Sequence, residues 1–204
     1  MIGAKVAVVF HSGFGHTAKQ AEAVHRGAAG VPGVTAHLVP VDGPDVPWDL
    51  LETCDAIIFG APTYMGGPSA PFKAFQDATS RTVWAALKWK DKIAAGFTNS
   101  GSRSGDKLAT LQQFAVFAAQ HGMHWVNLGL PPGNNVSTGS ERDLNRLGFF
   151  LGAAAQSNAD QGPDVVPPEA DLMTAEHLGA RVATVTLQLA FGRAALTGDP
   201  ERAG

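Results

Sequence analysis

The stretch Lys5-Val6-Ala7-Val8-Val9-Phe10-His11-Ser12-Gly13-Phe14-Gly15-His16-Thr17 decides the fold of this chain. Its first six residues form a continuous apolar run rich in β-branched side chains, which is typical of a strand covered on both faces. A glycine-containing turn follows, and apolar side chains then recur at helical spacing from Thr17 to Ala29. A buried strand, a tight loop and a helix make the repeating unit of a parallel α/β sheet.

The same alternation continues along the chain. Further strands are predicted at 34–39, 56–60, 92–98 and 123–128. Further helices are predicted at 48–52, 71–79, 106–121 and, as a long closing helix that Thr174 caps, at 175–196. Because right-handed crossovers place helices on both faces of such a sheet, the predicted fold class is α/β, a doubly wound parallel sheet of five strands.

Domain organisation follows from the length of 204 residues and the hydrophobic content of 45%. These values favour a single elaborated domain, 1–204, over two complete ones. The alternation breaks where proline and glycine clusters frame the apolar stretch 147–155, so we expect an insertion at about 129–173, between the last strand and the closing helix. So long an irregular region is either functional or interfacial, or it is a loosely ordered loop.

Composition argues against several classes of function. Lys and Arg total 15 against 18 Asp and Glu, and the net charge of −3 gives no basis for a nucleic-acid partner. The sequence has neither a signal-peptide pattern nor an apolar run long enough to cross a bilayer, so we expect a soluble cytoplasmic protein without a membrane partner. Cys54 is the only cysteine, which excludes an internal disulfide, and His121 and His124 lack a third ligand, so we predict no metal.

The loop after the first strand is the first candidate ligand site, because ligands of open α/β sheets bind beyond the carboxyl ends of the strands. It places hydroxyls and backbone amides at a helix start, which suits a phosphate. The segment 13–18 also satisfies the loose dinucleotide fingerprint G-x-G-x-x-A. A dinucleotide site favours an acidic residue at the end of the second strand, where Pro40 stands and Asp42 comes late. A turn that merely connects strand to helix is the third alternative.

Two more loops with distinctive chemistry follow the third and fourth strands. Pro62-Thr63-Tyr64-Met65-Gly66 holds an aromatic ring and a thioether in a turn, where they can wall a flat ligand or contact another subunit. The stretch from Thr98 to Gly105 offers hydroxyls, an amide and the charge of Arg103 to the polar edge of a ring such as the pyrimidine of a flavin. All three loops are expected at one edge of the sheet.

Together these residues resemble the flavodoxin-like superfamily, and within it the tryptophan-repressor-binding-protein type of NAD(P)H:quinone oxidoreductases and their FMN-binding relatives. The resemblance covers most of residues 4–128 and the final helix. Segment 12–17 is similar to the family's phosphate loop, 62–66 to the loop along the isoalloxazine ring, and 98–105 to the loop at its pyrimidine side. The cofactor-binding residues that the resemblance implies are Ser12, Phe14, Gly15, His16, Thr17, Pro62, Thr63, Tyr64, Met65, Gly66, Thr98, Asn99, Ser100, Gly101, Arg103 and Gly105.

The resemblance also implies a function. It predicts a flavodoxin-like FMN oxidoreductase that passes a hydride from NADH or NADPH through bound FMN to a quinone or similar acceptor, and it assigns no catalytic side chain. This chain departs from the quinone reductases of the family at Tyr64 and Met65, because those enzymes usually carry an arginine followed by an aromatic residue at these positions. The alternatives are a non-enzymatic flavodoxin-type electron carrier, which the modest charge of −3 disfavours, and an FMN-binding regulatory protein.

The resemblance further implies a homodimer or homotetramer. Trp84 and Trp89 concentrate two indoles in the stretch 82–90. Exposed aromatic surface of this kind marks a subunit contact, whereas buried indoles cover the core. The sequence leaves both alternatives open.

Overall fold

Strand β1 (Ala4–Phe10) is the strand around which the sheet is built. In the computed structural model, which describes residues 3–43 and 45–197, every residue of β1 except Lys5 is buried. β1 pairs in parallel with β2 (Val34–Pro40) on one side and with β3 (Ala56–Tyr64) on the other. A strand enclosed in this way must be apolar on both faces. Residues 1–2, 44 and 198–204, which the single-domain expectation includes, lie outside the described residues.

The sheet confirms the predicted doubly wound class. Its strand order is β2-β1-β3-β5-β6, with β4 paired to β3 and β7 to β5. Among the strand pairs of residues 3–43 and 45–197, only the short β3–β4 hairpin is antiparallel. The later strands are β4 (Gly67–Pro68), β5 (Ile93–Ser100), β6 (His124–Trp125) and β7 (Ala153–Gln156).

The fifth strand position differs from the sequence-based expectation, because it is filled by two short strands. β6 pairs with the start of β5 and β7 with its end, while residues 126–152 run outward between them. The predicted strand 123–128 is therefore shortened, and the expected insertion 129–173 contains β7 and the start of the last helix. Segment 153–155 consists of three alanines, which lack the β-branched side chains that mark a strand in a sequence.

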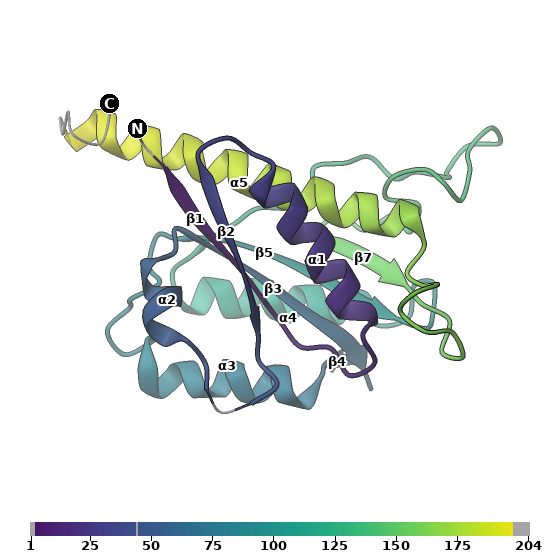
Figure 1. Ribbon diagram of the computed structural model, residues 1–204, viewed down its shortest axis with the longest axis horizontal. Coiled ribbons are helices and arrows are strands. Elements are labelled where there is room, and N and C mark those ends of the chain that lie inside the picture. The colour runs from purple at the N-terminus through teal and green to yellow at the C-terminus, as the bar shows by residue number, and fades with distance from the viewer. Residues whose placement is uncertain (1–2, 44, 198–204) are drawn as a thin grey trace.

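Helices cover both faces of the sheet, as Figure 1 shows. The helices are α1 (His16–Ala29), α2 (Trp48–Thr53), α3 (Ala70–Thr82), α4 (Lys107–Gln120) and α5 (Glu169–Thr197). Side chains of β1 alternate between the two layers: Val6 and Val8 pack with α1 and α5, whereas Ala7 and Val9 pack with the aromatic side chains of α3 and α4. The helices of the described residues are all too short or too polar to traverse a lipid bilayer.

The two indoles of the stretch 82–90 have different environments. Trp89 is fully buried and lies 6.4 Å from the ring of Phe59, between ring centroids, so it belongs to the aromatic core. Trp84 stays 43% exposed and donates its indole N–H to the Gln120 carbonyl. The core alternative is therefore correct for Trp89.

The start of α5 was predicted wrongly. Thr174 is not its N-cap but lies inside the helix, where its hydroxyl donates to the Ala170 carbonyl at 2.7 Å and accepts the Asn145 N–H at 2.9 Å. The helix begins at Glu169, directly after Pro167 and Pro168. Acidic residues in its first turn favour that start, because they face the positive end of the helix dipole.

α1 and α5 pack together unusually closely because glycines lie at their contact. A Cβ added at Gly179 would stand 1.9 Å from the Val24 carbonyl oxygen, and one added at Gly27 would stand 1.9 Å from the Glu176 carbonyl oxygen. Each helix therefore leaves room for the backbone of the other.

A substitution at this contact gives a direct test of the packing. We expect Gly179→Ala to lower the free energy of unfolding by about 2–3 kcal/mol, because the new methyl group meets a backbone atom that cannot move freely. Gly192→Ala is the matched control in the same helix, since no atom lies within 4 Å of its added Cβ. It should stabilise the chain by up to about 1 kcal/mol through helix propensity. Urea unfolding measures both, and equal effects would contradict the close contact.

Candidate functional site

The carboxyl ends of β1, β3, β5 and β7 converge at one edge of the sheet. The helix after β1 lies on one face and the helix after β3 on the other, so the strand order reverses between these two strands. A crevice opens at such a reversal in doubly wound sheets. The candidate site is built there by four loops.

The first loop leads from β1 into α1. Gly15 is the N-cap residue and has φ 85°, a left-handed conformation that glycine adopts without strain. The Ser12 hydroxyl accepts the Ala18 N–H at 3.1 Å, so it caps the helix from the turn before it. His16 and Thr17 form the first turn of α1, where backbone amides and the helix dipole favour an anion.

The second loop is a hairpin between β3 and β4. Its two turn residues, Met65 and Gly66, both have positive φ, 48° and 88°, as a type I′ turn requires. The turn directs Met65 into solvent, where it is fully exposed, and leaves Tyr64 beside the first loop. A Cβ added at Gly13 would stand 2.8 Å from the Tyr64 hydroxyl, so the phenol lies directly on this glycine.

The third and fourth loops, which follow β5 and β7, are joined by side-chain amides. Asn99 donates to the Ser157 hydroxyl at 2.8 Å, and Gln156 donates to the Gly101 carbonyl at 3.1 Å. The Asn99 Oδ1 atom is buried and has no hydrogen-bond partner within the described part of the chain. A buried acceptor without a partner is costly unless a ligand or water donates to it.

The fourth loop closes back onto the first. The His16 ring lies 2.8 Å from the Gln161 carbonyl, measured from Nε2 to the oxygen. The Pro163 ring covers Gly15, where an added Cβ would stand 2.9 Å from its Cγ. Asn158 holds the loop in shape by donating to the Gln161 side chain at 2.8 Å. The four loops therefore form a closed ring.

This ring encloses a cavity of about 380 Å³. Half of the sequence-predicted cofactor residues line it: Phe14, His16, Thr17, Pro62, Tyr64, Asn99, Ser100 and Gly101. Four residues that the sequence did not identify also line it: Ser157, Ala159, Gln161 and Gly162. The sequence signal for these four residues is the polar stretch that follows the apolar run ending at 155. It indicates a loop at the site only if β7 is predicted before it, and β7 was not predicted.

The remaining predicted residues support the cavity from behind or lie outside its lining: Ser12, Gly15, Thr63, Met65, Gly66, Thr98, Arg103 and Gly105. The Thr63 hydroxyl lies 2.7 Å from that of Thr98 and 2.8 Å from that of Thr110, and Thr98 donates to the Ala61 carbonyl at 2.7 Å. These hydroxyls join β3, β5 and α4 beneath the site and do not face it.

Arg103 is not among the residues that line the cavity. Its guanidinium pairs with the Glu141 carboxylate in the 126–152 segment, and both side chains are largely exposed. The role of Arg103 at the pyrimidine edge of a flavin stays a prediction.

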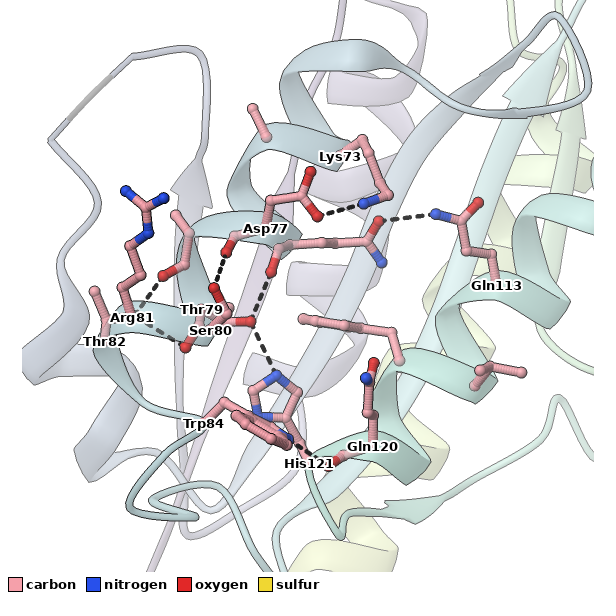
Figure 2. A pocket seen from close by; sticks show the side chains of 15 residues that line it. Lys73, Asp77, Thr79, Ser80, Arg81, Thr82, Trp84, Gln113, Gln120 and His121 are labelled. Atoms are coloured by element: carbon pink, nitrogen blue, oxygen red, sulfur yellow. Dashed lines mark hydrogen bonds and ion pairs between the residues drawn. The ribbon is translucent and has the colours of Figure 1, made fainter.

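A larger cavity of about 920 Å³ lies between α3 and α4, and Figure 2 shows the side chains that line it. Of the two cations in its lining, Lys73 and Arg81, Lys73 pairs with Asp77, and the Thr79 hydroxyl lies 3.0 Å from His121 Nε2. Burial lowers the pKa of His121 to about 4, which keeps the imidazole neutral near pH 7. The lining comes from helix sides and not from strand ends, so the smaller cavity is the candidate site.

Among residues 3–43 and 45–197, no group of three His, Cys, Asp or Glu side chains is arranged to hold a metal ion. His121 is buried and His124 lies 3.6 Å from the Asp91 carboxylate, at the far end of β6.

The chain resembles known proteins over most of its length. A family model described as NADPH-dependent FMN reductase matches residues 42–132. A protein of Pseudomonas aeruginosa strain UCBPP-PA14 named flavodoxin FldP is 44% identical over 189 residues, covering 91% of this chain and 98% of that protein. An NAD(P)H dehydrogenase (quinone) of Archaeoglobus fulgidus is 34% identical over 211 residues, covering 91% and 99%.

A solved structure shows the same fold. The crystal structure of a flavodoxin, a WrbA-like protein from Agrobacterium tumefaciens, superposes with a TM-score of 0.72 at 42% sequence identity. The match covers 91% of this chain and 99% of that one.

The cavity wall can be tested through Tyr64, the only tyrosine of the chain. Burial raises the pKa of its phenol above the ordinary value of 10.0. We expect the phenolate absorption of the ligand-free protein to reach its midpoint above pH 10, because the loops withhold water from the ionised form. Tyr64→Phe is the control and should abolish the transition. A midpoint at or below pH 10 would contradict the placement of Tyr64.

Proposed function

The chain belongs to the flavodoxin-like family of the WrbA type, and from that membership we propose that it binds one FMN and acts as an FMN-dependent oxidoreductase. The site that we assign to the cofactor is the cavity ringed by the four loops. One observation carries the assignment: four loops that lie far apart in the sequence line a single cavity, with a helix start at one side and an amide-rich edge at another.

The residues of the cavity fit this cofactor. Its volume of about 380 Å³ lies in the range of small-molecule sites. The amides at the start of α1, next to His16 and Thr17, suit the phosphate, and the aromatic rings of Phe14 and Tyr64 suit a flat ring system. The unpartnered oxygen of Asn99 offers an acceptor to the N–H of a flavin pyrimidine.

Bound FMN would supply the hydride chemistry, and the protein would supply its position. The first loop would hold the phosphate end. Asn99 would offer its unpartnered oxygen to the polar edge, while the contact of Pro163 with Gly15 would restrict water at the phosphate. None of these roles requires a proton to move to or from a side chain, so we assign no acid or base.

For the donor we propose NADH or NADPH, and for the acceptor a quinone-like molecule. The names of the matching family model and of the Archaeoglobus relative support this reaction. Phe14 is 74% exposed and Tyr64 40%, so aromatic surface is available at the mouth of the cavity for a planar donor or acceptor.

A second candidate is a non-enzymatic electron carrier. The Pseudomonas relative, which is 44% identical, bears the name flavodoxin, and this observation favours a carrier. The net charge of −3 provides little electrostatic steering toward a basic protein partner, and this favours the enzyme.

We further propose that the chain is one domain, forms a homodimer or homotetramer and works in the cytoplasm. Exposed Phe14 and Met65 beside the cavity support self-association, because water-exposed apolar side chains gain free energy when a second subunit covers them.

The reductase and the carrier are distinguished by an anaerobic titration of the FMN-loaded protein. We expect NADH or NADPH to bleach the visible absorption of the flavin, and a quinone to restore it. Dithionite is the control that shows the flavin to be reducible. Bleaching by dithionite but by neither nucleotide would contradict the reductase and favour the carrier.

A further inference from the structure

Lys107 is a buried cation beside the candidate site that the proposed chemistry does not use. It is the first residue of α4 and has no solvent-exposed surface. Its ammonium group donates to the carbonyl of Ser102 and, at 3.4 Å, to that of Arg103. The side chain therefore closes the third loop upon the helix that follows it.

This position is unfavourable for a lysine on two grounds. A positive charge at a helix N-terminus opposes the helix dipole. Burial lowers the pKa of Lys107 from 10.5 to about 8, which reflects the cost of removing the ammonium from water. A methionine fills a similar volume without either cost. The hydrogen bonds of the ammonium are what distinguish lysine here.

The charges around Lys107 come from two other elements. Asp171 of α5 attracts it, and Arg146 of the 126–152 segment repels it. These two residues form a buried bidentate pair with both N···O distances at 2.8 Å. Asp171 also accepts the Gln156 N–H at 2.9 Å, where the fourth loop begins.

The network holds the third loop at both ends. At its start, the Gln156 side chain donates to the Gly101 carbonyl at 3.1 Å. At its end, Lys107 gathers the carbonyls of Ser102 and Arg103. The loop contains two glycines, Gly101 and Gly105, so without these contacts it has many backbone conformations to lose on binding.

We propose that Lys107 is a positioning residue for the flavin site: its buried ammonium fixes the third loop in the shape that receives the ligand. The proposal rests on the proposed FMN site, because Asn99, Ser100 and Gly101 of this strand end and loop line the cavity. Lys107 does not itself line it, and acts through the backbone of Ser102 and Arg103.

The first test compares FMN affinity in two variants by fluorescence titration. Lys107→Met should bind FMN at least about tenfold more weakly, because the third loop must then be ordered at the expense of binding energy. Lys73→Met is the control, since Lys73 pairs with Asp77 on α3 and lies away from the flavin site. Equal affinity of Lys107→Met and wild type would overturn the proposal. Failure of the wild type itself to bind FMN would instead overturn the proposed function.

The second test uses the titration of Lys107. If the protonated side chain orders the loop, the affinity of the wild type for FMN falls as pH rises through about 8. The fall cannot exceed about tenfold per pH unit for one proton. Of the other groups that titrate, Arg146 stays charged in this range because its hydrogen bonds to Asp171 raise the pKa of its guanidinium, and burial raises the pKa of the Tyr64 phenol above its ordinary value of 10.0. Lys107→Met should lose the inflection near pH 8, and its persistence would overturn the assignment.

Hydrogen exchange of the ligand-free protein separates positioning from general stability. Positioning predicts faster exchange in Lys107→Met at residues 101–106, with little change in β1 and β3. Faster exchange throughout the sheet would show a role in the stability of the whole fold and would overturn the proposal.

Discussion

The parallel pairing of β1 with both β2 and β3 is the constraint on which the rest of the structure depends. Because these strands run in one direction, the loops that follow them must emerge at one edge. The reversal of strand order at β1 separates the helices α1 and α3 onto opposite faces and leaves a crevice between their starting loops. The cavity, the start of α1 at one side of it and the aromatic side chains in its wall all follow from this arrangement. Changing the loops alters the ligand without altering the sheet.

The fifth strand position is divided between β6 and β7, and this division adds a fourth loop to the site. Because β7 pairs with the carboxyl end of β5, the loop that follows β7 lies at the same edge of the sheet. Arg146 belongs to the chain between β6 and β7. It forms a buried ion pair with Asp171, and the charges of both residues act on Lys107. The segment that interrupts the strand is therefore joined to the loops of the cavity by charge and by hydrogen bonds. The exposed ion pair between Glu141 of this segment and Arg103 adds little stability, because water screens the two charges.

The sequence predicted the features that depend on local pattern and missed those that depend on distant partners. The apolar run of β1 and the glycine turn after it were enough to predict the class and the first loop. The three alanines at 153–155 did not predict β7, because their strand conformation comes from pairing with β5. The sequence suggested that Arg103 complements the polar edge of a ligand, but it could not predict the partner that the structure shows, Glu141, which lies 38 residues away in the sequence. The sequence could not predict a role for Lys107, because the burial that makes this lysine unusual is a property of the fold.

Binding of FMN compared with riboflavin is the most direct measurement of the central claim. The two ligands share the ring system and differ only in the phosphate, which the amides at the start of α1 are placed to receive. Titration of each into the ligand-free protein, followed by the loss of flavin fluorescence, should give one saturable site for FMN and much weaker binding of riboflavin. Failure of FMN to bind, or equal affinity for both ligands, would show that the loops at this edge do not form the flavin site.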